Sequence, residues 1–379
     1  MITAQASKRI QVENRTFLHR IDWNFAGVIL ALNIIGLINL YSATHGHGDV
    51  GASRLFIAQL FWLFTGWTIF FVVTLIDYQF FLRLSYVIYG LNLAALIAVM
   101  FVGKVALGAQ RWLDFGFFSY QPSESMKVAL VLILARVLSK RSYPDGMGWK
   151  DLALPLLGLI GVPFIITAEQ PDLGTAMMLF ITGASMLLFI RIKPKILVII
   201  GITLALCGTA AWFFALRDYQ KDRVYTFLDP TRDPRGKGYN SIQSKIAVGS
   251  GKVVGKGFRK GTQSQLEFLP ERHTDFIFSV LSEEHGFIGS MTTIGLFATL
   301  FLLGIRIASQ AKDKGGALLV VGVLGILFWH HFINIAMVIG LLPIVGVPLP
   351  LLSYGGSNML TTMAALGLVS SVSYRKHMF

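Results

Sequence analysis

The stretch KILVIIGITLALCGTAAWFFA, residues 195–215, is apolar apart from the lysine that opens it. A helix of this length reaches about 30 Å, which matches the hydrocarbon core of a bilayer. A hydropathy window of about 19 residues finds comparable runs along the chain, at 23–41, 55–76, 84–103, 122–138, 151–168, 172–190, 195–215, 275–304, 315–340 and 354–373. With 54% hydrophobic and only 14% charged residues among 379, the composition excludes an ordinary soluble domain. We therefore predict an all-α polytopic membrane protein of about ten transmembrane helices.

Basic residues predict the orientation of this bundle. Lys and Arg gather in alternate short connections and in both tails, whereas the short loops of the other side hold only Arg54, Lys104 and Arg111. Short cytoplasmic loops are enriched in Lys and Arg, so both termini are expected inside. The predicted organisation is a cytoplasmic tail at 1–22, seven helices within 23–216, a large extracytoplasmic loop at 217–274, three helices within 275–373, and a cytoplasmic end at 374–379.

The long loop between the seventh and eighth spans is strongly charged. From Arg217 to Asp275 it holds twelve basic and seven acidic residues. On the outer side of a membrane this excess favours an anionic lipid headgroup or a lipid-linked phosphate over nucleic acid, although a simply solvated loop would look the same. Its glycine-rich part, 249–257, lacks the spacing of a nucleotide-binding P-loop, because no Ser or Thr follows Gly255-Lys256.

The end of this loop, GTQSQLEFLPERHTDF at 261–276, brings acids, amides, a histidine and an arginine together just before a span. Asp275 lies at the threshold, where partial burial can hold a carboxylate in a defined geometry. The alternative is that Asp275 or Thr274 only caps the following helix. We expect Gln263, Arg272 and His273 of the same stretch to contact the substrate.

Lys127 lies six residues into the fourth predicted span, too deep for a free surface charge. An intramembrane lysine needs a partner, and Glu124, Asp172 or Asp275 could provide it. A purely structural ion pair explains the same pattern. Glu169 and Asp172 bound a tight turn between the fifth and sixth spans, and the pattern does not decide which of Glu124, Glu169 and Asp172 supports Lys127.

Two further outer segments carry candidate substrate ligands. Arg111 stands beside Trp112 in a short loop, in a group suited to clamping phosphate or sugar. The last outer loop, 340–357, is rich in Pro and Gly and cannot continue a helix, which is tolerated at membrane depth only where backbone is buried in protein or lines a cavity. Ser353 and Ser357 could form an anion-binding nest there, or the loop could be a rigid plug.

These segments together resemble the SEDS family of bacterial membrane proteins (shape, elongation, division and sporulation). The stretch FLPERHTDFIF at 268–278 is similar to the branch that determines rod shape, and supporting matches are AQRW at 109–112, QPSE at 121–124, QPDLG at 170–174 and Pro350 through Ser357. The resemblance covers nearly the whole chain. It implies a ten-helix peptidoglycan glycosyltransferase of the bacterial inner membrane that polymerises lipid II at the outer leaflet. It also implies a class B penicillin-binding protein, a transpeptidase, as partner within the elongation machinery. The family's essential acid falls on Asp275 and a basic residue associated with it on Lys127.

The chemistry expected from this resemblance needs a base and a way to stabilise the leaving diphosphate. Asp275 is assigned as the base for the acceptor hydroxyl, with Lys127 keeping it ionised. Arg111, helix N-termini and a divalent cation such as Mg²⁺ or Mn²⁺, whose ligands the sequence does not identify, would stabilise the leaving group. Two other functions fit a polar, ten-helix bundle: a flippase or transporter for the same lipid, and a non-catalytic scaffold that activates the transpeptidase.

Overall fold

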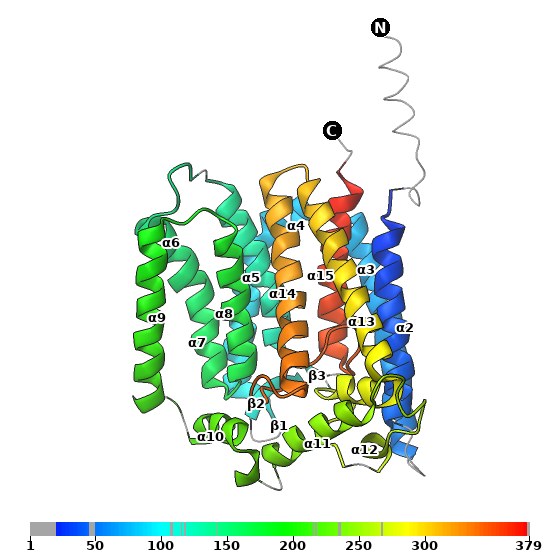
Figure 1. Cartoon of the computed structure of the whole chain (residues 1–379). Coiled ribbons are helices and arrows are strands. Elements are labelled where there is room, and N and C mark those ends of the chain that lie inside the picture. The colour runs from blue at the N-terminus through cyan, green and yellow to red at the C-terminus, as the bar shows by residue number, and fades with distance from the viewer. Residues whose placement is uncertain are drawn as a thin grey trace, which may run out of the picture.

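The computed structural model describes residues 20–44, 50–106, 109–114, 116, 119–141, 143–214, 216, 218–233, 236–266 and 268–376. Long helices run side by side through the molecule (Figure 1). Their bounds are α2 (Trp23–Thr44), α3 (Val50–Leu75), α4 (Tyr78–Val102), α5 (Pro122–Ser139), α6 (Trp149–Ala153), α7 (Val162–Glu169), α8 (Leu173–Leu188), α9 (Pro194–Phe214), α13 (Ile277–Ser309), α14 (Lys314–Val338) and α15 (Gly356–Tyr374). A π-helical stretch, Leu154–Gly161, joins α6 to α7 into one continuous rod.

The prediction of an all-α polytopic membrane protein is confirmed. Within the described residues, seven helices are long and apolar enough to cross a membrane: α2, α3 from Arg54 onward, α4, the α6–α7 rod, α9, α13 and α14. Helix α8 is apolar but has only 16 residues. Helices α5 and α15 stand among the others in the bundle (Figure 1). The count of ten spans stays a prediction.

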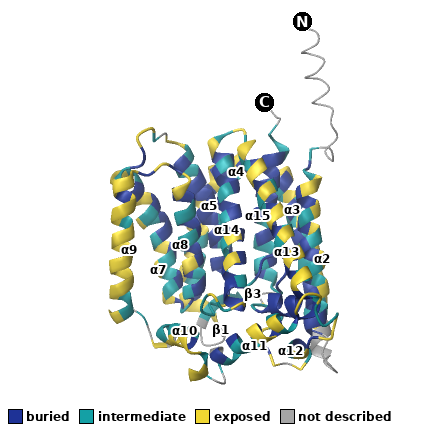
Figure 2. Cartoon of the chain, in the orientation of Figure 1, coloured by how far each residue is buried: buried dark blue, intermediate teal, exposed yellow. Residues whose placement is uncertain are grey.

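Burial sorts the helices into a centre and a rim. In α14, 67% of the most apolar window is buried inside the protein, compared with 6% in α9. Helix α14 packs against α5, α8, α13 and α15, and α9 stands apart at one edge of the molecule (Figure 2). Polar groups on α14 and α5 are therefore enclosed by protein, whereas an α9 side chain faces the surroundings.

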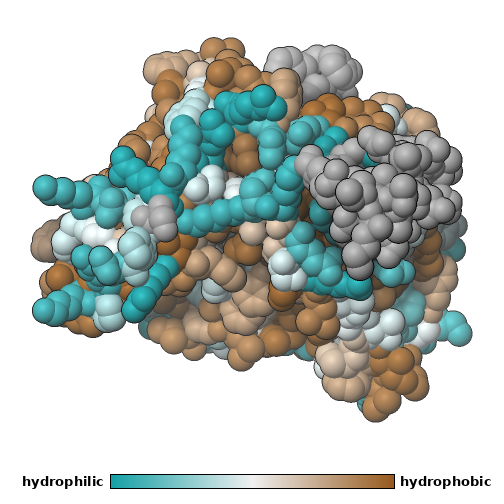
Figure 3. Space-filling view, turned by 90° about the horizontal axis from the view of Figure 1, so that it is seen from above, coloured by the Kyte–Doolittle hydropathy of each residue, from teal (hydrophilic) through white to brown (hydrophobic). Residues whose placement is uncertain are grey.

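The two ends of the bundle differ. Helix α2 begins, and α15 ends, at the same face; seen from that side, hydrophilic residues run across it and apolar ones surround them (Figure 3). Antiparallel strands β1 (Lys104–Ala106), β2 (Ala109–Asp114) and β3 (Ser119–Tyr120) form a small sheet near the opposite face. The hydropathy pattern did not predict this sheet, because its strands are shorter than any hydropathy window.

The charged segment that was predicted as a loop is partly helical. It contains α10 (Asp218–Leu228), a 3₁₀ turn at Pro230–Arg232, α11 (Lys237–Ser250) and the short α12 (Thr262–Gln265). These elements lie across the bundle end that also carries the sheet (Figure 1). Ile246, Val253 and Val254 are exposed there, as expected for a segment that lies along a bilayer surface.

Candidate functional site

Asp275 lies in a turn that directly precedes α13. The helix begins after Phe276 and no side chain caps it, so the alternative role of Asp275 or Thr274 as a helix cap is wrong. The Asp275 Oδ2 atom lies 3.3 Å from the place where a Cβ on Gly346 would stand, and Gly346 has a φ of +78°. The last outer loop therefore passes directly against the Asp275 carboxylate at a residue without a side chain.

The environment of this carboxylate changes its acidity. Burial and, to a lesser extent, the charge of Glu271 raise the pKa of Asp275 to about 6, although the charge of Arg223 lowers it. A carboxyl group with this pKa is ionised near pH 7 yet accepts a proton more readily than an exposed aspartate does. A general base needs this property, and the catalytic role of Asp275 stays a prediction.

Hydrogen bonds from two directions hold the backbone around Asp275. Asn334 on α14 donates through Nδ2 to the carbonyl oxygens of Asp275 (2.8 Å) and Val347 (2.7 Å). Ser353 donates through Oγ to the Thr274 carbonyl (2.7 Å) and accepts from the Leu349 amide (2.8 Å). Ser353, a predicted substrate ligand, uses its hydroxyl on the backbone here, so it joins the last outer loop to the Asp275 turn.

Lys127 is 2% exposed on α5 and has two close partners. Its Nζ lies 2.9 Å from Glu124 Oε1 and 2.7 Å from His330 Nε2. Among the described residues no ion pair joins Lys127 to Asp275, so the predicted direct pair between them is not formed. Glu124 is the carboxylate that supports Lys127, because its position three residues earlier on the same helix brings the two side chains to one face.

The ion pair lines a small cavity inside the bundle, between α5, α14 and α15. Its polar lining comes from Glu124, Lys127, His330, Asn358, Thr361 and Thr362. The rest of the wall is apolar and comes from α5, α14 and α15, together with Pro350. A charged group beside enclosed space inside a membrane protein marks a functional site more often than a structural one.

Arg111 and Asp172 form a second polar group, at the turn between α7 and α8. Arg111 donates to the carbonyl oxygens of Gln170 and Pro171 and lies 3.6 Å from Asp172 Oδ1. Asp172 also caps α8 by accepting from the Thr175 amide. Asp172 therefore serves Arg111 and α8 rather than Lys127, and Glu169 is exposed at the end of α7.

The other predicted substrate ligands are distributed around the Asp275 turn. Arg272 donates through Nε to the Ala43 carbonyl (2.7 Å). His273 faces the Tyr354 ring at 6.1 Å, and burial lowers its pKa. Ser357 accepts from the Gln121 amide (3.3 Å). Gln263 has a buried Oε1 that finds no hydrogen-bond partner among the described residues. The substrate contacts of all four stay predictions.

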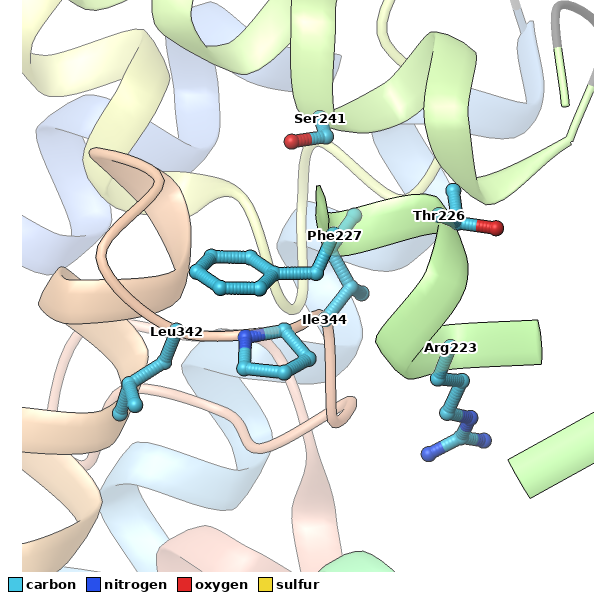
Figure 4. A pocket seen from close by; sticks show the side chains of 7 residues that line it. Arg223, Thr226, Phe227, Ser241, Leu342 and Ile344 are labelled. Atoms are coloured by element: carbon cyan, nitrogen blue, oxygen red, sulfur yellow. The ribbon is translucent and has the colours of Figure 1, made fainter. Parts of the chain in front are cut away.

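Three residues near Asp275 and Lys127 were missed in the sequence: His330, Asn334 and Arg223. The signal for the first two was present, since polar side chains within the apolar run 315–340 are costly unless they have a partner. Arg223 on α10 donates to the Val345 carbonyl (3.3 Å). It lines a shallow pocket together with Thr226, Phe227, Ser241, Leu342, Pro343 and Ile344 (Figure 4).

No group of three or more His, Cys, Asp or Glu side chains that could hold a metal ion occurs in the part of the chain that the structure describes. The involvement of a Mg²⁺ or Mn²⁺ ion stays a prediction.

Known proteins resemble this chain along almost its whole length. A family model described as "cell cycle protein", covering FtsW, RodA and SpoVE, matches residues 22–378. The peptidoglycan glycosyltransferase MrdB of Escherichia coli strain K12 is 40% identical over 351 residues, which cover 93% of each protein. The peptidoglycan glycosyltransferase RodA of Treponema pallidum is 32% identical over 427 residues, with 94% of this chain and 98% of the relative covered.

Solved structures of two related proteins also match this chain along almost its whole length. A chain from a peptidoglycan synthase complex that coordinates polymerisation and crosslinking matches with a TM-score of 0.80 and 30% identity, over 95% of this chain and 99% of that one. The crystal structure of the rod shape determining protein RodA of Thermus thermophilus matches with a TM-score of 0.70 and 27% identity, over 95% and 98%. The family resemblance inferred from the motifs is thus confirmed: the chain belongs to the FtsW/RodA/SpoVE family of cell cycle proteins.

Proposed function

We propose that this protein is a peptidoglycan glycosyltransferase of the RodA type, which polymerises lipid II into glycan strands during cell elongation and maintains cell shape. The observation that carries the proposal is Asp275, a carboxylate with a pKa of about 6 in a turn fixed by Asn334 and Ser353. Relatives named peptidoglycan glycosyltransferase support it.

In the proposed reaction Asp275 accepts the proton of the acceptor sugar hydroxyl. The freed oxygen attacks the anomeric carbon of the donor sugar, and the bond from that carbon to the diphosphate oxygen breaks. The electron pair leaves with undecaprenyl diphosphate. Three cations could offset the charge that develops on the leaving diphosphate: Arg111, Arg223 and Lys127. The Lys127 ammonium has three N–H groups and two partners among the described residues. Because Lys127 is bonded to Glu124 and His330, Arg223 replaces it as the cation that favours the ionised form of Asp275.

The proposed topology has ten spans in the bacterial inner membrane, both termini in the cytoplasm, and 217–274 outside. The position of the start of α2 and the end of α15 at one face, and of α10 to α12 at the other, supports this arrangement. Asp275 would then work at the outer leaflet, where the isoprenoid tails of two substrates could rest against apolar helix walls.

The proposed partner is a class B penicillin-binding protein within the elongation machinery. Support comes from the structural neighbour that belongs to a peptidoglycan synthase complex. A transpeptidase would crosslink the strands that this chain polymerises.

We propose that any Mg²⁺ or Mn²⁺ in the reaction is carried by the substrate diphosphate, since hard cations bind phosphate oxygens together with water. Titration of polymerisation with EDTA and each ion tests this. No step above depends on the metal.

The decisive experiment reconstitutes the full chain in liposomes with labelled lipid II and compares wild type with Asp275→Asn. Loss of the base should lower the polymerisation rate at least about 100-fold. Asp222→Asn is the control, because Asp222 is an exposed carboxylate of the same charged segment, and it should leave the rate unchanged.

The same assay separates the rival functions. Lipid crossing the bilayer without any polymer from the wild type would favour a flippase. Absence of both, with stimulation of the transpeptidase partner intact, would favour a scaffold.

A further inference from the structure

Two neighbouring histidines on α14 differ sharply in their surroundings. His330 Nε2 lies 2.7 Å from Lys127 Nζ, and His330 Nδ1 lies 3.3 Å from the Pro348 carbonyl oxygen. Both ring nitrogens of His331 are buried and have no hydrogen-bond partner within the part of the chain that the structure describes, and its ring packs on Phe297. Of these two histidines, only His330 has hydrogen bonds, among the described residues, to polar groups of two other segments.

The partners of His330 fix its protonation pattern. A lysine ammonium has only donors, so Nε2 of His330 accepts from Lys127. In the neutral ring the proton is then on Nδ1, which donates to the Pro348 carbonyl. His330 thereby joins the Glu124–Lys127 pair to the last outer loop.

One helical turn further along α14, Asn334 continues this connection. Asn334 donates to the carbonyl oxygens of Val347 and Asp275. Residues four apart lie on one face of a helix, so α14 holds the consecutive carbonyls of Val347 and Pro348 from the same side. The residue before them, Gly346, lies against the Asp275 carboxylate.

We propose that His330 is a positioning residue for the proposed glycosyl transfer: it fixes the Lys127 ammonium and the 346–348 segment in one arrangement relative to Asp275. The proposal rests on the proposed function. Lys127, Glu124 and His330 all line the cavity, and without the imidazole the lysine ammonium keeps Glu124 as its one side-chain partner among the described residues. The loop segment would lose the bond at Pro348 at the same time.

The test compares three variants of the full chain in proteoliposomes with lipid II. His330→Phe removes both bonds and should lower kcat roughly 10- to 100-fold, since small misplacements near reacting groups cost rates of this size. The KM for lipid II should change less than about 3-fold, because His330 acts through other residues and not on the substrate. His330→Gln keeps an acceptor for Lys127 and a donor, and should recover most of the lost kcat.

His331→Phe is the matched control, a buried histidine on the same helix without polar partners, and should retain wild-type kcat. Thermal unfolding in detergent shows whether each variant is folded. A folded His330→Phe protein with wild-type kcat overturns the inference while the proposed function stands, provided that Asp275→Asn is inactive. Equal losses in His330→Phe and His330→Gln, or a loss in KM alone, also overturn it. If the wild type forms no polymer, the proposed function itself has failed.

Discussion

Two lysine–glutamate pairs among the described residues differ in what surrounds them. In the cavity pair, Lys127 and Glu124 are 2.9 Å apart and both are buried. In the latch pair, Lys256 and Glu283 are 2.7 Å apart, Glu283 is fully buried and the Lys256 side chain is 27% exposed. The first pair lines a cavity within the bundle, and the second joins the charged segment 217–275 to α13.

The hydrogen bonds of the two pairs explain the contrast. Glu283 also accepts from the Thr262 hydroxyl and from the backbone amides of Gln263 and Ser264. Its carboxylate therefore binds free amides at the N-terminus of α12. Lys127, by comparison, has three N–H groups and two partners among the described residues. A satisfied pair stabilises a fold, whereas a pair with a donor left over beside a cavity can act on a ligand.

The largest expected effect comes from breaking the cavity pair. Lys127→Met should lower polymerisation at least about 100-fold, because a cation of the site is lost. It should also destabilise the protein, since Glu124 is left buried and unpaired. Adding Glu124→Gln should restore the melting temperature, because removal of both charges of a buried pair is often neutral.

The polymerisation rate of the double variant decides whether the cavity pair differs from the latch pair. Polymerisation should stay low in Glu124→Gln/Lys127→Met although its stability recovers. Recovery of both would make the cavity pair as structural as the latch pair.

The next effect concerns pH. A base works only when ionised, so with the pKa of Asp275 at about 6 the rate should fall about 10-fold for each pH unit below 6 and level off above about 7. Arg223→Gln removes the positive charge that lowers this pKa, so the acidic limb of the pH–rate profile, where the rate falls with falling pH, should move to higher pH. Glu271→Gln removes a charge that raises it, and the limb should move to lower pH.

Rates of the three proteins across pH 5 to 8, in vesicles of one lipid composition, provide the measurement. Shifts of the same sign in both variants would show that Asp275 does not control the acidic limb.

Local features of this site were predictable from the sequence. Glu124 and Lys127 are three residues apart on one helix, so helix geometry offers this pair, although the sequence also left Glu169 and Asp172 open as partners. The turn at Glu169–Asp172 was predicted from polar residues and a proline between two apolar runs. Asp275 was identified because its charge stands at the edge of a span. Each of these predictions needed only neighbours in sequence.

Contacts between distant segments were not predictable. Lys127 meets a histidine 203 positions away, and the Asp275 backbone is held by an asparagine 59 positions away. Hydropathy gives the order of helices but not which faces meet. Lys127 was therefore expected to keep Asp275 ionised, whereas the structure has Arg223 as the cation whose charge lowers the pKa of Asp275. The cost of burying His330 and Asn334 indicated that partners exist without showing which.

The smallest expected effect on activity comes from the latch pair. Glu283→Gln keeps the size of the side chain but loses one acceptor oxygen, so the amides of Gln263 and Ser264 and the Lys256 ammonium are no longer all satisfied. The free energy of unfolding should fall by about 1–3 kcal/mol, measured by thermal or denaturant unfolding. Polymerisation per folded molecule should stay within about 2-fold of wild type, because no group at Asp275 or the cavity is removed.

Lys256→Met is the control, since it retains the carboxylate for the backbone donors and should destabilise less. A folded Glu283→Gln protein as slow as Lys127→Met would mean that the latch pair also belongs to the site, and that spare hydrogen-bonding capacity does not separate the two pairs.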